Sequence, residues 1–198
     1  MSTTFAAVDL ETTGLNARTD AIIEVGAVIF RDGEILDEWE SLVDPQRLLP
    51  EFITGLTGIT QQMVDEAPLL GSLKPTIGRL LNGRPIVGHN VGFDLAFLNE
   101  ERLAVGSHRL DTATLASIVL PEAGRYSLES VVSHLGLNDV AKGPQHRALA
   151  DARRTAAVFM ALQARTAELD FAALEEIVLA GQRLNWPETL FFEEALRQ

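Results

Sequence analysis

The stretch TFAAVDLETTG, residues 4–14, places two acidic residues at the end of an apolar run. Asp9 and Glu11 lie two positions apart, and alternate residues of a strand point to the same face of a sheet. Neighbouring carboxylates repel each other, and a cation held between them relieves that repulsion. The stretch therefore predicts a strand whose end carries part of a metal site; the simpler alternative is a strand end with solvated acids.

The composition bounds the classes of protein to which the chain can belong. It has 198 residues and no Cys, which suits one domain with a short appendage and excludes a disulfide framework, a thiolate zinc site and a thiol nucleophile. No apolar run reaches the ~18 residues that a membrane span needs. The N-terminal sequence does not have the pattern of a secretory signal. We expect a soluble, cytoplasmic protein that does not bind a membrane.

The net charge of -12 argues at first against a nucleic-acid partner, because proteins that bind nucleic acid usually carry a basic surface. The total conceals one basic segment, residues 141–165, which would lie beside an incoming phosphate. Its charged residues are five bases and one acid, namely Lys142, Arg147, Arg153, Arg154, Arg165 and Asp151.

Apolar periodicity along the chain predicts an α/β fold with a mixed, five-stranded sheet covered by helices on both faces. Asp32 and Gly33 separate an apolar strand from an alternating one, which is a hairpin signal. Asn90 is a candidate N-terminal cap for the helix that follows it. The expected strands are 4–11, 21–30, 34–43, 85–88 and 109–111, and the main expected helices are 68–81, 147–165, 171–179 and 188–196.

Further acids lie where this fold would bring them near Asp9 and Glu11. Asp94 and Asp151 each lie in the first turn of an expected helix, and His146 precedes the second of these helices. Taken singly, each acid also suits the positive end of a helix. Four converging carboxylates need cations, and oxygen ligands fit two Mg²⁺ or Mn²⁺ ions that promote displacement at phosphorus, with a histidine taking the proton of water. The set predicts metal-assisted phosphodiester hydrolysis.

Three motifs in the sequence resemble those of the DEDDh (DnaQ-like) 3′–5′ exonucleases, the family of the proofreading epsilon subunit of DNA polymerase III. They span residues 8–14, 89–94 and 146–151. The resemblance covers about residues 4–165 and implies an RNase H-like fold. It also implies an exonuclease domain over residues 1–165 and a helical C-terminal extension over residues 166–198.

The resemblance implies a role for each motif residue. Asp9, Glu11, Asp94 and Asp151 would bind two Mg²⁺ or Mn²⁺ ions, and His146 would be the general base. The residues that would bind or support the substrate are Thr12 through its backbone, Leu15 as a wedge against the terminal base, Thr57 near the sugar, and Asn90, with Phe93 beside it. His89 is more simply a hydrogen-bonded histidine at a strand end.

The implied activity is release of nucleoside 5′-monophosphates from the 3′ end of single-stranded DNA, in proofreading or repair. Thr57 stands where the family often has His, which leaves an RNA- or short-oligonucleotide-trimming enzyme as an alternative. A non-catalytic scaffold for a polymerase or helicase is a second alternative. The chain also resembles the exonuclease region of DinG-type helicases, so it is either free-standing or linked to a helicase domain. We expect the tail aromatics Trp186, Phe191 and Phe192 to pack on the core.

Overall fold

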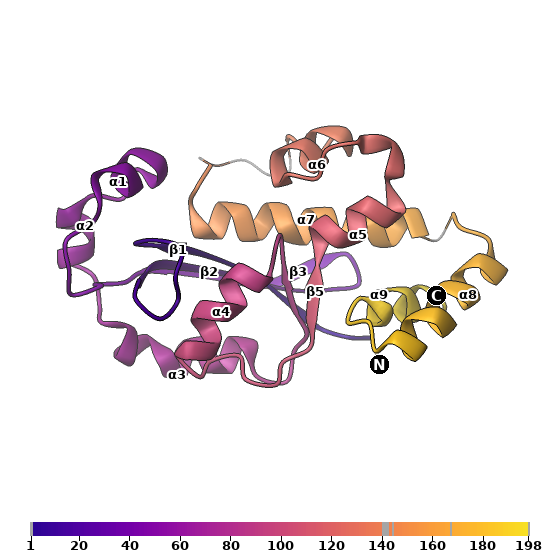
Figure 1. Cartoon of the computed structure of the whole chain (residues 1–198), viewed down its shortest axis with the longest axis horizontal. Helices are drawn as coiled ribbons and strands as arrows, with labels where there is room; N and C mark the ends of the chain where they lie inside the picture. The colour runs from indigo at the N-terminus through magenta and orange to yellow at the C-terminus, as the bar shows by residue number, and fades with distance from the viewer. Residues whose placement is uncertain (1, 140–142, 144, 167, 198) are drawn as a thin grey trace.

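A mixed sheet forms the centre of the molecule (Figure 1). The computed structural model describes residues 2–139, 143, 145–166 and 168–197. Within these residues the strands are β1 (Phe5–Thr12), β2 (Ile22–Arg31), β3 (Glu34–Leu42), β4 (Ile86–Gly88) and β5 (Arg109–Asp111). Their order in the sheet is β3-β2-β1-β4-β5. Because β2 is antiparallel to its neighbours and β4 is parallel to its own, the predicted mixed, five-stranded sheet is confirmed.

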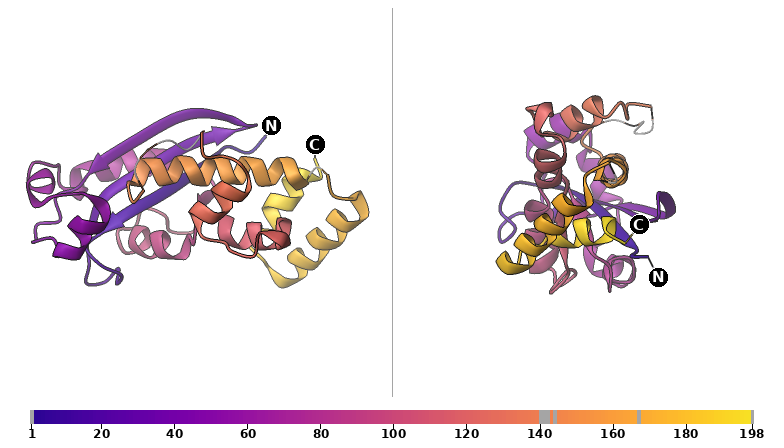
Figure 2. Two further views of the ribbon diagram at one scale, coloured as in Figure 1. Left: turned by 90° about the horizontal axis from the view of Figure 1, so that it is seen from above. Right: turned by 90° about the vertical axis from the view of Figure 1, so that its right-hand side faces the viewer.

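Helices cover both faces of this sheet, as the sequence predicted (Figure 2). One face carries α5 (Thr112–Val119), α6 (Leu128–His134) and the long α7 (Ala148–Thr166), and the other carries α3 (Leu70–Leu81) and α4 (Gly92–Glu100). The short helices α1 (Glu51–Thr57) and α2 (Gln61–Asp65) pack on Ile23 of β2, and a 3₁₀ turn spans Pro121–Ala123. Among the described residues, no helix has both the length and the apolar character that crossing a membrane requires.

The hairpin between β2 and β3 turns at the predicted Asp-Gly pair. Asp32 and Gly33 have φ angles of 52° and 80°, so both adopt the left-handed conformation. This combination characterises the tight turn whose twist matches two antiparallel strands. The local sequence therefore determines the register in which β2 begins to pair with β3.

The alternation of side chains along β1 decides which face carries its acids. Phe5 and Ala7 pack in the cluster beneath α7, whereas the even-numbered side chains of residues 6–10 pack with α3 and α4. Since alternate residues share a face, Asp9 and Glu11 point to the side on which α7 lies. The predicted common face of these two acids is therefore confirmed.

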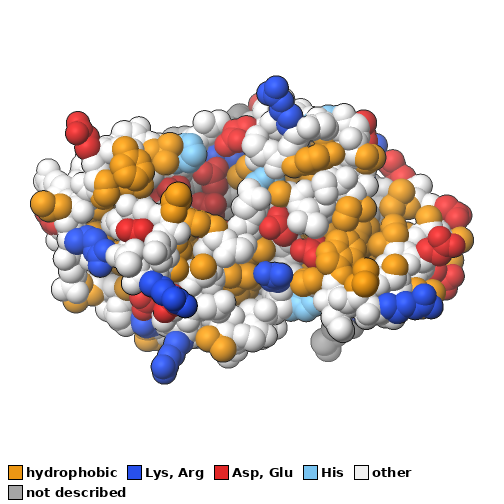
Figure 3. All heavy atoms as spheres, in the orientation of Figure 1, with side chains coloured by type: hydrophobic (Ala, Val, Ile, Leu, Met, Phe, Trp, Pro, Cys, Tyr) orange, Lys and Arg blue, Asp and Glu red, His pale blue; other side chains and the backbone are white. Residues whose placement is uncertain are grey.

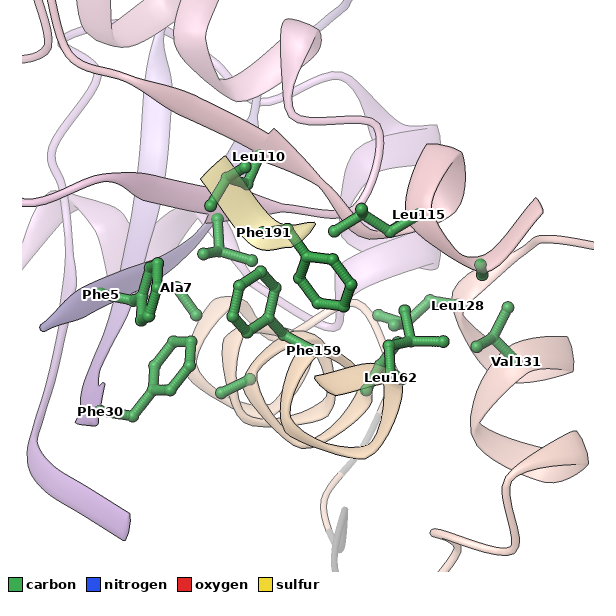
Figure 4. Close-up of a cluster of buried hydrophobic side chains, with 14 of the residues drawn as sticks. Phe5, Ala7, Phe30, Leu110, Leu115, Leu128, Val131, Phe159, Leu162 and Phe191 are labelled. Carbon is green, nitrogen blue, oxygen red and sulfur yellow. The ribbon is translucent and has the colours of Figure 1, made fainter. Parts of the chain in front are cut away.

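Aromatic side chains from the C-terminal helices complete the core beneath α7. These helices are α8 (Phe171–Leu184) and α9 (Thr189–Ala195), and Phe191 and Phe192 of α9 are fully buried. The ring centroids of Phe191 and Phe159 lie 5.2 Å apart, within the cluster that also contains Phe5 and Phe30 (Figure 4). Each buried Phe contributes about 1.5–3 kcal/mol to stability. The expected packing of Phe191 and Phe192 is confirmed, and α8 extends to residue 184 rather than 179.

Gly26 of β2 allows the N-terminus of α7 to approach the sheet closely. It pairs with Asp9 on the neighbouring strand. A Cβ atom added at Gly26 would lie 2.2 Å from the carbonyl carbon of Ala148 and 2.3 Å from the amide nitrogen of Leu149. Because both are backbone atoms, only a shift of α7 itself could make room. The missing side chain therefore sets the distance between α7 and the acidic end of β1.

We expect the substitution Gly26→Ala to push the first turn of α7 away from β1 and to lower the free energy of unfolding by about 1–3 kcal/mol, as overpacking does. Urea unfolding followed by circular dichroism measures the change. Gly55→Ala in α1 is the matched control, because an added Cβ there meets no atom within 4 Å and alanine favours the helix. Equal stability of the two variants would contradict the role assigned to Gly26.

Candidate active site

Glu11, His146 and Asp151 come together at the carboxyl end of β1. Their potential ligand atoms all lie within 4.8 Å of one another. Glu11 and Asp151 are buried, and His146 is half-buried in the loop before α7. Figure 3 shows acidic side chains inside a hollow between the surfaces over α1 and α6. The structure thus joins residues from the first and third sequence motifs.

Asp94 approaches β1 from α4, on the face of the sheet opposite α7. Its side chain accepts a backbone hydrogen bond from β1 where a neighbouring strand would otherwise do so. The amide of Ala6 donates to the carbonyl of Pro85, on the edge of β1 that faces β4. The amide of Leu10 points to the same edge, but β4 ends at Gly88. Asp94 Oδ1 accepts that amide at 3.0 Å. The buried first turn of α4 is therefore attached to the part of β1 that carries the acids.

Asp9 lies at the electrostatic centre of the acidic cluster. Burial raises the pKa of its carboxyl well above the ordinary value. The negative charges of Asp94, Asp151, Glu11 and Glu24 raise it further. The four acids that the sequence singled out therefore act on one another, together with a fifth acid that the sequence analysis did not select.

The pKa values of two more carboxyls in the cluster are raised. Burial raises that of Glu11 to about 8, with help from the charges of Asp151 and Glu24. Burial raises the pKa of Asp94 to about 7, although the hydrogen bond from Leu10 lowers it. Such carboxyls bind protons near neutral pH unless a metal cation takes the place of the protons. A set of oxygen donors with one histidine nitrogen suits a hard divalent cation, so these residues fit a metal site.

Glu24 is the buried acid that the sequence analysis missed. It lies opposite Glu11 across the β1–β2 pair and is only 1% exposed. Arg147 donates to both of its oxygens, with Nη2 at 2.6 Å from Oε1, and the amide of Ala148 donates to Oε2 at 2.8 Å. Glu24 therefore fixes the position at which α7 begins. The sequence feature that could have indicated Glu24 is its position as an acid within the otherwise apolar run 21–30.

Asp111 organises the turn that leads into α4, and the structure corrects the predicted cap at Asn90. The helix begins at Gly92, and no side chain caps it. Asn90 is exposed with a φ of 61°, and its amide and that of Val91 donate to the Asp111 carboxylate at 3.2 and 3.0 Å. Asp111 also accepts the amide of Ala113 and so caps α5. One carboxylate from β5 thus holds the turn before α4 and caps α5, and the predicted side-chain cap at Asn90 is not formed.

His89 has the structural role that the sequence analysis favoured. Its Nδ1 lies 2.9 Å from the hydroxyl of Thr112, and its Nε2 lies 2.7 Å from the carbonyl oxygen of Tyr126. Burial lowers the pKa of the imidazole. His89 therefore connects the end of β4 with the start of α5 and the segment before α6.

Thr12 and Leu15 follow the acids of β1 directly. The Thr12 hydroxyl donates to the carbonyl of Gly14 at 2.6 Å, so its side chain bonds within the turn. Leu15 is 88% exposed at the tip of this turn. Leu15 is thus accessible four positions after Glu11, and its role as a wedge stays a prediction, as does the backbone contact of Thr12.

Thr57 is buried at the end of α1. Its hydroxyl donates to the carbonyl of Ile53 at 2.9 Å and accepts the amide of Ile59 at 3.0 Å. The side chain therefore stabilises the turn after α1. Its predicted contact with a substrate sugar would have to share a hydroxyl that already makes two internal hydrogen bonds.

The basic segment 141–165 does not present the free positive surface that its composition indicated. Within the described residues, each of its arginines lies in an ion pair, and Lys142 lies outside the described residues. The segment therefore offsets acids of the same chain. The pairs are Arg147 with Glu24, Arg153 with Glu38, Arg154 with Asp151, and Arg165 with Glu168.

A comparison with protein families identifies the arrangement. The RNase T family model, described as exonuclease, matches residues 6–159 and thus all three motifs. The chain belongs to this exonuclease family. The sequence-based resemblance is thereby confirmed at the level of the family.

Curated relatives of this exonuclease chain are larger proteins. The PolC-type DNA polymerase III of Thermotoga petrophila is 39% identical over 181 residues, which cover 88% of this chain and 13% of the relative. The 3′-5′ exonuclease DinG of Bacillus subtilis is 31% identical over 179 residues, which cover 87% of this chain and 19% of the relative. The chain therefore spans less than a fifth of the length of either relative.

Solved structures share the exonuclease fold. Exonuclease X in complex with 5′-overhanging duplex DNA matches with a TM-score of 0.70 and 27% identity, covering 83% of this chain and 94% of that one. Exonuclease I of E. coli in complex with a dA16 oligonucleotide matches with a TM-score of 0.71 and 20% identity, covering 89% of this chain and 44% of that one. The predicted RNase H-like fold is confirmed.

Without divalent ions, this chain should lose stability as the pH rises from about 5 to about 9. The raised pKa values of Glu11 (about 8) and Asp94 (about 7) mean that the folded state binds more protons than the unfolded state in this range. The contribution of these two carboxyls to stability is fully present below the ordinary carboxyl pKa of about 4. It is lost as the pH rises through their pKa values in the folded state. Thermal unfolding in EDTA measures the loss, and saturating Mn²⁺ should flatten the profile. A metal-free midpoint that rises with pH would contradict this linkage.

We expect Glu24→Gln to lower the free energy of unfolding by about 3 kcal/mol, because a neutral amide with one acceptor oxygen replaces neither the charge nor both acceptors that Arg147 and the Ala148 amide use. Glu38→Gln provides a matched control, since Glu38 of β3 also binds an arginine of α7 but at an exposed position. That change should cost less than about 1 kcal/mol. Denaturant titration measures both changes. Equal losses of unfolding free energy would contradict the larger contribution expected from the buried ion pair of Glu24.

Proposed function

We propose that this chain is a metal-dependent 3′–5′ exonuclease of the DEDDh type that acts on single-stranded DNA and releases nucleoside 5′-monophosphates. The observation that carries the proposal is the cluster of Glu11, His146 and Asp151, with ligand atoms within 4.8 Å, coupled electrostatically to Asp9 and Asp94. Family membership supports hydrolysis of nucleic acid. The related DinG protein is named a 3′-5′ exonuclease, and the exonuclease I structure contains an oligonucleotide.

Asp9, Glu11, Asp94 and Asp151 would hold two divalent ions, Mg²⁺ or Mn²⁺. Such ions, when bound, supply Lewis-acid stabilisation of the charge that develops on phosphate and on the leaving oxygen. The protein fixes two of these ligands through its backbone. Leu10 N–H donates to Asp94, and the His146 amide donates to Asp151 Oδ2 at 3.0 Å. Preorganised ligands of this kind keep their geometry without a substrate.

His146 would accept the proton of the attacking water. It lies on a loop beside Glu11 and Asp151, half-buried and therefore open on one side. Neutral imidazole is the side chain best suited to proton transfer near neutral pH. The exposed Leu15 would wedge against the terminal base, the Thr12 backbone would contact the terminal nucleotide, and Asn90 would support the opposite side of the site.

Residues 1–165 would form the exonuclease domain, with residues 166–198 as an extension whose described part packs on it through α8 and α9. The chain would operate with a polymerase or helicase, either as a separate subunit or as one domain of a longer protein. The relatives support this context, since both combine a region like this chain with a much longer sequence.

Single-stranded DNA labelled at its 3′ end should release labelled mononucleotide in the presence of Mg²⁺ or Mn²⁺. Asp9→Ala should lower the rate by at least about a thousandfold, on the scale of losing a principal catalytic group. Asp37→Ala, which changes an exposed acid of β3, should retain the full rate. No release by the unaltered chain, or equal release by Asp9→Ala, would contradict the proposed function.

An RNA- or short-oligonucleotide-trimming activity is the second candidate, because Thr57 stands where the family often has His. A hydroxyl that already makes two internal hydrogen bonds is a poor reader of the sugar. The same assay on matched RNA and DNA oligomers compares the two, and a large preference for DNA excludes RNA as the main substrate. Metal-dependent turnover of either nucleic acid also excludes a purely scaffolding role.

A further inference from the structure

Arg154 is a buried arginine inside the candidate active site. It lies three residues after Asp151 on α7 and is 7% exposed. Its Nη1 donates to Asp151 Oδ1 and its Nη2 donates to the carbonyl oxygen of Gly143, each at 2.5 Å. Arginine is almost never fully buried unless it is paired. These two contacts help to compensate a charge placed beside a proposed metal ligand.

Arg154 and Asp151 together hold two points of the loop that carries His146. Arg154 binds the carbonyl of Gly143, and Asp151 Oδ2 accepts the amide of His146 at 3.0 Å. His146 has a φ of 55°, in the left-handed region that is uncommon for residues other than glycine, although His enters it more often than most. Such a conformation persists where the surrounding structure enforces it. The paired side chains of α7 supply that enforcement.

We infer that Arg154 is a positioning residue that ties the His146 loop to α7 and supplies the positive charge beside Asp151 when no metal is bound. A guanidinium can do both at once because its planar fork presents several donors in fixed directions. The ammonium of lysine is a compact charge on a flexible stem, and its donors have no such fixed fork. The catalytic part of this inference rests on the proposed function, whereas the effect on Asp151 concerns metal binding alone.

The two contacts have opposite consequences for metal binding and for turnover. The guanidinium and a divalent cation both act on the Asp151 carboxylate and repel each other, so Arg154 weakens metal binding. Its contact with Gly143 holds the His146 loop in place, so Arg154 accelerates proton transfer. A residue with a purely structural role would support both properties together.

Arg153 offers a matched comparison on the same helix. It is adjacent in sequence and forms an ion pair with Glu38 of β3, with Nη2 at 2.6 Å from Oε2. The side chains of this pair are 38% and 30% exposed, compared with 9% for Arg154. Replacing either arginine removes one positive charge from α7, but only Arg154 contacts Asp151 and the His146 loop.

The test uses the full chain with Arg154→Met, Arg154→Lys and the control Arg153→Met. Calorimetry measures Mn²⁺ binding, and steady-state kinetics on single-stranded DNA give kcat and KM. Arg154→Met should bind Mn²⁺ about fivefold more tightly and lose about ten- to a hundredfold in kcat with little change in KM. Arg154→Lys should keep the Mn²⁺ affinity of the unaltered chain with an intermediate kcat, and Arg153→Met should change neither property.

A second measurement needs no activity. The thermal midpoint of Arg154→Met should fall further below that of the unaltered chain in EDTA than in saturating Mn²⁺, because tighter metal binding restores more stability. Weaker Mn²⁺ binding by Arg154→Met, or the same changes in Arg153→Met, would overturn the inference. If Arg154→Met does not fold, an unchanged kcat in Arg154→Lys overturns the tying role. An inactive unaltered chain would contradict the proposed function instead, and the Mn²⁺ measurements would still decide the effect on Asp151.

Discussion

The contact between the N-terminus of α7 and β2 is the constraint on which the acidic cluster depends. Glu24 binds the amide of Ala148 and the side chain of Arg147, and Gly26 leaves space for the backbone of α7. If α7 began farther from the sheet, Asp151 would no longer reach the end of β1. On the other face, the hydrogen bond from Leu10 places Asp94 independently. Separate polar contacts thus attach α7 to β2 and α4 to β1.

Local features of the site were predictable from the sequence because they depend on short spacings. The alternation along β1 placed Asp9 and Glu11 on one face, and the start of an apolar helical pattern placed Asp94 and Asp151 in first turns. The Asp-Gly turn of the first hairpin is also local. Each of these features requires only the periodicity of a strand or a helix and the preferences of turn residues.

Contacts between distant residues were not predictable from the same patterns. Glu24 and Arg147 are 123 positions apart, and no periodicity within either segment indicates that they pair. The error at Asn90 has a different cause. Asparagine is favoured both as a helix cap and in the left-handed conformation, and the sequence does not distinguish these uses. In the structure Asn90 adopts the left-handed conformation, and the amide of Phe93 donates to the backbone carbonyl of Asn90 rather than to its side chain.

The net charge was misleading because its distribution matters more than its sum. Exposed acids cover much of β3, whereas the acids that act on one another are buried or half-buried near the end of β1. The arginines described in the basic segment pair with acids of the same chain. The basic composition of this segment therefore does not indicate a free positive surface for phosphate. The total charge of -12 therefore says little about the chemistry of the site.

Positive charge within the cluster is distributed unevenly, and this decides where a cation would be stabilised most. Arg154 binds Asp151, and Arg147 lowers the pKa of Glu11 against the effects of burial and like charges. The influences on Asp9 are burial and four negative neighbours, all of which raise its pKa. The uncompensated negative charge is therefore concentrated around Asp9. This charge lies near the end of β1, between the two helices that carry Asp94 and Asp151.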